Sequence, residues 1–484
     1  MHENNIITLL RAQLPAHCVL SEPEELRPYE CDGLSAYRQL PMVVVIPETL
    51  EQVQVTLRLC ADHKVAVVAR GSGTGLSGGA LPLESGVLLS LAKFNRILEI
   101  DTANRVARVQ PGVTNLSISD AAAPHGLYYA PDPSSQIACS IGGNVAENAG
   151  GVHCLKYGLT THNIQALEVL TVNGEHLSIG GPALDSPGYD LLALLTGSEG
   201  LLGIIVEVTV KLLPRPEAAQ VVLAAFDSVD AAGAAVTATI ASGIIPAGLE
   251  LLDKPAITAV RRFIQTGYPE HASAILLCDL DGAQEDVSTQ IEHVSQVFTD
   301  SGATELKVSQ NESERQLFWA GRKAAFPAMG RLSPDYYCMD GTIPRKHLAR
   351  VLNEIEALSQ QYGLPVCNVF HAGDGNLHPL ILYDANTAGE LERTEELGGK
   401  ILELCIAVGG TITGEHGVGL EKINQMCVQF NTRELQQFHA VKQAFDPDNL
   451  LNPGKAIPTL HRCAEFGAMH VHAGQLPHPE LERF

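Results

Sequence analysis

Two histidines, His371 and His378, lie on either side of a short glycine-rich turn, residues 372–376 (AGDGN). Apolar runs flank them, so a β-hairpin that closes at this turn would bring the two imidazoles close together. For an arbitrary pair, two histidines that simply bond to backbone groups would be the commoner arrangement. Neighbouring imidazoles are nevertheless what the ligation of a divalent metal requires.

A third candidate ligand lies in another glycine-flanked segment, residues 413–419 (TGEHGVG). Glu415 precedes His416 there, and two histidines with one carboxylate are a recurring ligand set for zinc, iron or manganese. A metal bound to a hydroxyl lowers its pKa, so an imidazole that titrates near neutrality can remove the proton. These residue types therefore predict metal-assisted removal of a proton from an alcohol.

Arg322, in the helical segment FWAGRKAAF, is a candidate anchor for a substrate carboxylate. A guanidinium can bind a carboxylate in bidentate fashion, whereas the neighbouring Lys323 would be only a point charge. An arginine on a helix is more often a solvated surface charge. The aromatic neighbours Phe318, Trp319 and Phe326 favour a partly apolar setting instead.

A glycine-rich stretch, residues 70–80 (RGSGTGLSGGA), follows an apolar run and offers bare backbone N–H groups to a bulky anion. Its glycines match the GxGxxG spacing of a Rossmann site, but Pro82 and Gly86 prevent a helix from starting there. The prediction is therefore a loop between strands that holds a pyrophosphate. The alternative is a glycine-rich turn without a ligand.

A second such stretch, residues 131–151 (PDPSSQIACSIGGNVAENAGG), has no long apolar run, although strand-like segments flank it. Long irregular segments inside a compact domain are usually functional. We therefore expect this stretch to contribute to the same binding site.

With residues 197–212 (GSEGLLGIIVEVTVKL), these motifs resemble the FAD-binding half of the vanillyl-alcohol-oxidase-type, or PCMH-type, flavoproteins. Within that group the chain is similar to the D-2-hydroxyacid dehydrogenases, and most closely to the flavin-carrying D subunits of bacterial glycolate dehydrogenase, also called glycolate oxidase. The likeness covers nearly the whole chain. It implies an enzyme that oxidises glycolate to glyoxylate by hydride transfer to FAD, with D-lactate or another D-2-hydroxy acid as the alternative substrate.

The resemblance also implies roles for individual residues. His371, His378 and Glu415 become ligands of a divalent metal (Zn, Fe or Mn), His416 the general base and Arg322 the carboxylate anchor, while Asn376 holds a ligand or the substrate, or else only stabilises its turn. The first glycine-rich stretch lacks histidine and cysteine, so FAD is expected to bind without a covalent link. The residues expected to contact FAD are Arg70, Gly71, Ser72, Gly73, Thr74, Gly75, Ser77, Gly78, Gly79, Pro131, Asp132, Ser134, Ser135, Gly142, Gly143, Asn144, Asn148, Gly150, Gly151, Gly158, Glu199, Gly200, Ile205, Val206 and Asn452.

An α+β fold is expected, because helices and strands do not alternate strictly along the chain. Two prolines at 214 and 216 indicate a domain boundary. The resemblance implies a two-lobed protein, with a PCMH-type FAD-binding domain at 1–215, a ferredoxin-like cap (substrate) domain at 216–408 and a C-terminal segment returning to the flavin at 409–456. The tail, 457–484, is a candidate docking segment for a partner, or else a packed or frayed terminus.

Composition and charge argue against several other classes of protein. The formal net charge of −23 argues against nucleic acid and against docking on anionic lipid. There is no apolar run of the ~18 residues that a membrane span needs, and the N-terminus lacks the features of a secretion signal, so a cytoplasmic location is expected. The eleven cysteines include no close pair, which argues against a disulfide framework and against an iron–sulfur cluster.

Without a cluster of its own, the chain would pass electrons to partners. The resemblance implies a second flavin-type subunit and an iron–sulfur subunit, through which the chain could associate peripherally with the inner face of the cell membrane. The expected substrate is a small 2-hydroxy monocarboxylate, because relatives that act on dicarboxylates have a lysine where this chain has Cys338. Lys323 or Arg331 could supply that charge from another direction.

Two rival readings are a non-catalytic flavin-binding scaffold and an oxidase that passes electrons to oxygen. A scaffold should have lost some of the candidate anchor, metal ligands and base, which lie far apart in the sequence, whereas all of them are present here. Oxygen reactivity depends on access to the flavin, which the sequence does not define.

Overall fold

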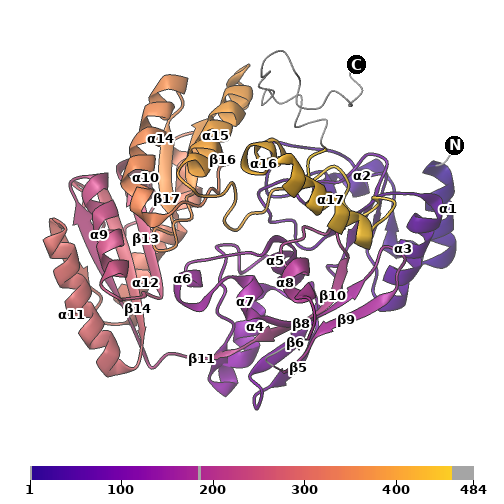
Figure 1. Ribbon diagram of the computed structural model, residues 1–484, viewed down its shortest axis with the longest axis horizontal. Helices are drawn as coiled ribbons and strands as arrows, with labels where there is room; N and C mark the ends of the chain where they lie inside the picture. The colour runs from indigo at the N-terminus through magenta and orange to yellow at the C-terminus, as the bar shows by residue number, and fades with distance from the viewer. Residues whose placement is uncertain (1–2, 184–186, 460–484) are drawn as a thin grey trace. The chain divides into compact units, whose positions relative to one another are not determined.

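The computed structural model describes residues 3–183 and 187–459, which form two compact units (Figure 1). The first unit contains residues up to Ala149, Leu159–Pro214 and the chain from His416 onward, and the second contains Gly150–Gly158 and Arg215–Glu415. The candidate docking tail lies almost wholly outside the described residues. Within those residues, no helix is both long and apolar enough to span a bilayer.

The first unit is built on two main sheets. The four-stranded sheet has the order β1-β2-β4-β3, in which β2, β4 and β3 are parallel and β1 is antiparallel: β1 (Val19–Leu20), β2 (Val43–Val45), β4 (Val87–Ser90) and β3 (Val67–Arg70). The five-stranded sheet is antiparallel throughout: β5 (Ile97–Asp101), β6 (Val106–Val109), β10 (Ile204–Lys211), β8 (Ile164–Leu170) and β9 (His176–Gly180). β7 (Leu127–Tyr128) and β11 (Leu213–Pro214) form a small third pair.

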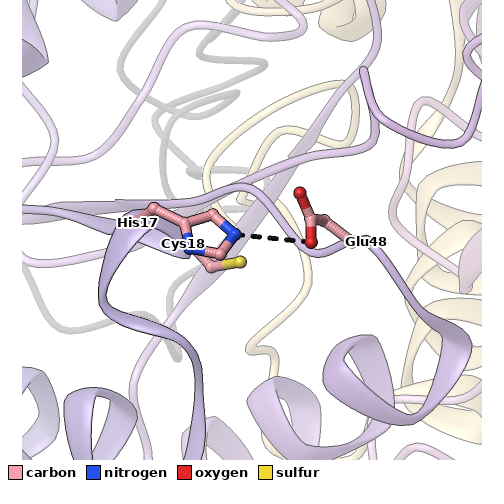
Figure 2. Close-up of side chains that lie close together, drawn as sticks. All are labelled: His17, Cys18 and Glu48. Atoms are coloured by element: carbon pink, nitrogen blue, oxygen red, sulfur yellow. Dashed lines mark ion pairs between the residues drawn. The ribbon is translucent and has the colours of Figure 1, made fainter.

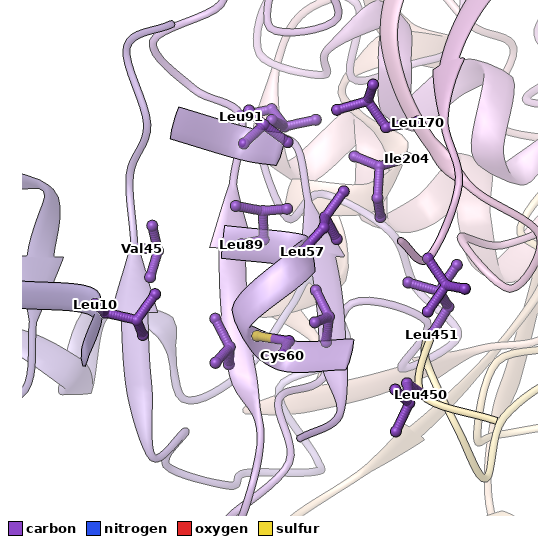
Figure 3. Close-up of a cluster of buried hydrophobic side chains, with 14 of the residues drawn as sticks. Leu10, Val45, Leu57, Cys60, Leu89, Leu91, Leu170, Ile204, Leu450 and Leu451 are labelled. Carbon is purple, nitrogen blue, oxygen red and sulfur yellow. The ribbon is translucent and has the colours of Figure 1, made fainter. Parts of the chain in front are cut away.

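One hydrophobic core in the first unit joins segments that lie far apart in the sequence (Figure 3). It contains Leu57 of α3 (Leu50–His63), Leu89 of β4, Ile204 of β10 and Leu451 near the C-terminus, all at most 1% exposed. Truncating such a buried leucine to alanine typically costs about 2–5 kcal/mol of stability. The C-terminal segment is therefore an integral part of the first unit's core.

The glycine-rich stretch 70–80 lies between β3 and β4, and no helix forms there, as the sequence predicts. The second glycine-rich stretch is partly helical, so the expectation of a wholly irregular segment was wrong. Residues Ile141–Glu147 form α5, because the Ser140 side chain caps the helix by accepting from the Gly143 N–H. Two glycines at the start of the helix hid this signal.

The second unit contains a seven-stranded antiparallel sheet with helices packed beside it. This is the mixed α+β architecture that we expect for the cap. Its order is β15 (Glu305–Val308), β12 (Ala218–Phe226), β14 (Ala274–Gly282), β13 (Gly248–Asp253), β17 (Val366–Phe370), β18 (Pro379–Tyr383) and β16 (Asp335–Cys338). Helices α11 (Gln284–Asp300), α9 (Val229–Ala241), α14 (Leu348–Tyr362) and α15 (Glu390–Ala407) pack one beside the next, and Figure 1 labels all four. Helix α12 (Glu312–Lys323), which contains Arg322, packs on β12.

Candidate functional site

The hairpin predicted around the two histidines forms. Strands β17 and β18 pair in antiparallel register, His371 follows the first strand, and His378 precedes the second. The turn is closed by the His371 N–H, which donates to the Asn376 carbonyl at 3.1 Å. As a result the two imidazole rings meet edge to face, with their centroids 5.2 Å apart.

Residues 340–343 join this hairpin to the segment that contains Glu415. Thr342 and Thr411 exchange two backbone hydrogen bonds, and Leu377 donates to the Gly341 carbonyl. The buried Asp340 carboxylate accepts from the Glu415 N–H at 3.2 Å and from the Thr413 hydroxyl at 2.6 Å. Asp340 therefore fixes the loop before Glu415, a role that the sequence analysis missed because it considered this segment only for Cys338.

The three predicted ligands, His371, His378 and Glu415, come together in the second unit. Nε2 of His371 lies 3.2 Å from Glu415 Oε1, and Nε2 of His378 lies 3.1 Å from the same oxygen. One possible ligand atom from each residue lies within 4.8 Å of the others, and all three side chains are at least nine-tenths buried. Two imidazole nitrogens and a carboxylate oxygen at this separation fit zinc, iron or manganese.

The charges of this cluster reinforce one another. Burial raises the pKa of Glu415, but hydrogen bonds from His371 and His378 outweigh it and hold that pKa well below its usual range. Burial lowers the pKa of both histidines, and the neighbouring carboxylates reverse this: Glu250 raises the pKa of His371, and Asp340 with Glu415 raises that of His378. In this cluster, protonated histidines lie beside ionised carboxylates. A divalent ion that bound there would therefore replace protons on the histidines.

Arg322 is buried on α12, with its side chain 3% exposed. Its Nε donates to Oε2 of the fully buried Glu250 at 2.6 Å, while its Nη2 is buried and bonds to no group in the described part of the chain. The other oxygen of Glu250 bonds to Nδ1 of His371 at 2.7 Å. A single carboxylate thus contacts both the predicted anchor and a predicted metal ligand.

Two more buried oxygens face the loop before Glu415. Asn376 Oδ1 and Thr342 Oγ1 have no hydrogen-bond partner among the described residues. A Cβ added to Gly414 would lie 2.4 Å from the first and 2.5 Å from the second, so only glycine fits between them. The turn is stabilised by the Asp374 carboxylate, which accepts from the backbone N–H of Asn376 at 3.1 Å, and the role of the Asn376 side chain stays a prediction.

In the first unit, Ser140 brings the two glycine-rich stretches together. Its hydroxyl oxygen accepts from the Ser72 N–H at 3.3 Å and from the Gly143 N–H at 3.4 Å. A Cβ on Gly71 would lie 2.0 Å from that oxygen. No backbone N–H from Gly73 to Gly79 donates to another described residue, so this loop keeps its donors for an anion and fits a pyrophosphate.

The C-terminal segment holds this loop in place. Leu451 pairs with Val67 of β3, and the Asn452 amide donates to the carbonyls of Gly79 and Glu199. Lys455 donates to Gly79, Leu81 and the Asn452 side chain, and its burial lowers the pKa of its ammonium to about 8. Asn452 and Lys455 therefore support the loop through protein contacts, and the sequence analysis had not singled out Lys455.

Other residues predicted to contact FAD make protein contacts in the first unit. The Glu199 carboxylate accepts from the N–H groups of Val418 and Gly419, the Asn148 side chain accepts from Thr161, and Asn144 bonds to the buried Asn115. Arg70 donates to the Tyr29 carbonyl. The backbones of Pro131, Asp132, Ser134, Ser135, Gly142, Gly200, Ile205 and Val206 belong to the same unit, as do those of the first glycine-rich stretch.

Three of the predicted FAD contacts, Gly150, Gly151 and Gly158, belong to the second unit. Gly150 packs against the candidate metal ligand: a Cβ there would lie 2.7 Å from Glu415 Oε2. The predicted base, His416, is the first residue of the C-terminal part of the first unit and is half-buried. Its catalytic role stays a prediction.

A different group of donors lies near the N-terminus, in the first unit (Figure 2). His17, Cys18 and Glu48 each offer one atom within 4.8 Å of the others, and His17 Nε2 lies 3.3 Å from Glu48 Oε2. The side chains of His17 and Glu48 are 66% and 44% exposed. Burial, and then the charge of Glu48, raise the pKa of the Cys18 thiol.

Two family models match the chain, over the regions that make up these sites. Residues 41–180 match the FAD binding domain, and residues 215–456 match the C-terminal domain of FAD-linked oxidases. The chain belongs to the family of FAD-linked oxidases, in the group of glycolate oxidase subunit GlcD.

The relatives behind that grouping are close. The chain is 66% identical to "Glycolate oxidase subunit GlcD" of Escherichia coli K12 over 480 residues, 99% of this chain and 96% of the relative. It is 41% identical to the subunit of the same name from Bacillus subtilis, over 88% of this chain and 91% of the relative. The crystal structure of p-cresol methylhydroxylase has the same fold, with a TM-score of 0.80 at 20% identity over 95% of this chain and 98% of that one.

Proposed function

We propose that this chain is the FAD-linked subunit of a glycolate dehydrogenase, which oxidises glycolate to glyoxylate. The names and similarity of its relatives support this assignment. The observation that carries it is the carboxylate of Glu250, which contacts the predicted anchor Arg322 and the predicted metal ligand His371 at once. A short 2-hydroxy acid, with a carboxylate and a hydroxyl on neighbouring carbons, fits an anchor and a metal ligand that share one carboxylate.

Each group then has a part in oxidising a 2-hydroxy acid. Arg322, through its Nη2, which has no partner in the described part of the chain, would bind the substrate carboxylate in a buried setting. A divalent ion held by His371, His378 and Glu415 would supply Lewis acidity to the substrate hydroxyl. His416, next to Glu415 in the chain, would accept the hydroxyl proton, and bound FAD would supply the hydride acceptor.

The substrate is proposed to be a monocarboxylate. Cys338 and Met339 are buried and uncharged, and the two other cations considered for a second carboxylate, Lys323 and Arg331, are exposed. The Arg331 guanidinium lies over the Phe263 ring, 5.7 Å from its centroid. D-lactate is the second candidate, because it has the same carboxylate and hydroxyl with one methyl group more.

We also propose that FAD is bound without a covalent link and that electrons leave to partner subunits, one of flavin type and one with an iron–sulfur cluster, through which the chain would associate peripherally with the membrane. The first glycine-rich stretch has no histidine or cysteine to attach the cofactor. Acid denaturation should release FAD into the supernatant, and colour that stayed with the precipitate would refute the non-covalent assignment.

The proposed activity is tested by an anaerobic absorbance spectrum of the purified protein with glycolate. The expected result is bleaching of the oxidised-flavin spectrum, followed by recovery when an artificial electron acceptor is added. A spectrum that does not change with glycolate or with D-lactate would contradict the proposal. A scaffold without catalytic function would behave in that way.

A further inference from the structure

Glu250 is a buried acid between two leucines, in a strand that is otherwise apolar up to its last residue, Asp253. It lies in β13, which reads GLELLD, and its side chain is 0% exposed. A buried carboxylate without partners costs several kcal/mol, so such a group is kept only where it is paired. Here both oxygens are used: Oε2 accepts from Arg322 Nε at 2.6 Å, and Oε1 bonds to His371 Nδ1 at 2.7 Å.

The contact with His371 fixes which ring nitrogen faces the candidate metal site. Nδ1 points to Glu250, and Nε2 points to Glu415 Oε1 at 3.2 Å. A histidine that donates from one nitrogen to a carboxylate presents the lone pair of the other and becomes a stronger ligand. Glu250 is therefore placed as the outer partner of a metal-binding histidine.

The contact with Arg322 fixes the plane of the guanidinium. The hydrogen bond from Nε–H holds one edge of the guanidinium against Glu250. The buried Nη2 then has no partner among the described residues. Without Glu250, this arginine would be a buried charge free to turn toward other acceptors. Its orientation toward a substrate thus depends on the same carboxylate that orients His371.

We propose that Glu250 is a positioning residue that couples the two halves of the site, holding His371 for the metal and Arg322 for the substrate carboxylate. This inference rests on the function proposed above. It predicts that one substitution, Glu250→Gln, weakens metal binding and substrate binding together. Gln keeps the shape but has only one acceptor oxygen, so it cannot accept from both partners.

The same sheet face supplies a matched control. Asp279 on β14 is also a fully buried acid, and it accepts from Arg315 and Trp319 of the same helix α12, at 2.7 and 2.9 Å. None of its described hydrogen bonds involves His371 or Arg322. Asp279→Asn therefore removes an ion pair between α12 and the sheet at an equally buried carboxylate, with an arginine that is 19% exposed, and does not disturb either partner of Glu250.

The first test measures Zn²⁺ affinity by competition with a chelator, on FAD-loaded protein without glycolate. Glu250→Gln is expected to weaken Zn²⁺ binding by about 10- to 100-fold, as loss of an outer partner usually does, while Asp279→Asn leaves it unchanged. Unchanged Zn²⁺ affinity in Glu250→Gln would overturn the inference. An equal loss in both variants would overturn it too, because the effect would then be general destabilisation of the sheet.

The second test uses saturating Zn²⁺ to restore the metal and compares kcat with KM for glycolate. Glu250→Gln is expected to raise KM by about tenfold with a smaller fall in kcat, because the guanidinium is misaligned when the substrate binds.

A second variant serves if Glu250→Gln does not fold. Glu250→Asp keeps the charge but is too short to reach both partners. Wild-type values of both Zn²⁺ affinity and KM in that variant would also overturn the inference. If the wild-type protein binds Zn²⁺ but glycolate does not reduce its FAD, the proposed function is contradicted. The claim that Glu250 orients His371 for the metal would still hold.

Discussion

Two of the groups of histidine and carboxylate donors in the described part of the chain have similar spacing and different surroundings. His371, His378 and Glu415 are buried in the second unit, whereas His17 and Glu48 of the other group are 66% and 44% exposed. Donor atoms within 4.8 Å of one another occur in both groups. Proximity of donors therefore does not distinguish them.

The difference lies in what holds the donors. His371 is held by Glu250, and Glu415 by hydrogen bonds from its backbone to the buried Asp340. Around the N-terminal group, the described contact of the Cys18 thiol is a long one, 3.9 Å to Gln52. Ligands whose orientation is fixed in advance bind a metal without the entropic cost of ordering them, so the buried group is the one that we propose as a metal site.

The largest effect should come from His378→Ala. Loss of a ligand from the buried group should lower reduction of FAD by glycolate by at least about a hundredfold, because the substrate hydroxyl loses its Lewis acid. FAD should stay bound, since the glycine-rich loop that fits it lies in the first unit. Stopped-flow absorbance measures the rate, and the flavin spectrum of the same sample is its control. Full activity in this variant would contradict the assignment.

Discrimination against a dicarboxylate should be the next largest effect. Leaving a second carboxylate buried without a partner costs several kcal/mol, which corresponds to a few powers of ten in kcat/KM. Steady-state rates of the wild type with glycolate, D-lactate and D-2-hydroxyglutarate would measure it. Equal use of the diacid would mean that another cation reaches the pocket.

Arg322→Lys should have a smaller effect on a different parameter. A lysine keeps the charge but cannot bond to Glu250 and to a carboxylate with the same planar fork, so KM for glycolate should rise by about 10- to 100-fold. Zn²⁺ affinity should hardly change, since Arg322 is not a ligand. A large loss of Zn²⁺ affinity with an unchanged KM would contradict the role of Arg322 as the carboxylate anchor and would indicate that it supports the metal site instead.

The double substitution His17→Ala and Glu48→Gln should have the smallest effect. Both side chains are exposed, so stability and glycolate oxidation should stay close to wild type. Metal analysis of the FAD-loaded protein should give the same content in both proteins. A loss of metal and activity in the double variant would move the functional site to the N-terminal group.

Local signals in the sequence predicted much of this site. The hairpin at 371–378 follows from a glycine-rich turn between two apolar runs, and burial of Arg322 follows from its aromatic neighbours. Glu250 and Asp340 were missed because their partners are 72 to 121 and 73 to 75 residues away and belong to other elements. A single Glu inside an apolar strand was the available signal, since a buried charge requires a partner.

The contacts that hold the glycine-rich loop were harder to predict. Glycine spacing identified the loop and excluded a Rossmann helix, but it did not distinguish residues that line the loop from residues that hold it. The side chains of Glu199 and Asn452 bond to the protein backbone, which the sequence did not predict, and their contacts with FAD stay predictions. The reason is that the C-terminal segment, more than 250 residues along the chain from Glu199, packs beside β3, which no local pattern encodes.

The most direct test of the central claim compares anaerobic reduction by glycolate in three samples of the same FAD-loaded protein: as purified, stripped with a chelator, and refilled with Zn²⁺ or Mn²⁺. The account predicts rapid bleaching of the flavin in the first sample, little or none in the second although FAD remains bound, and recovery in the third. Bleaching at the full rate in the stripped protein, with metal analysis confirming that it is empty, would contradict the claim that His371, His378 and Glu415 act through a metal.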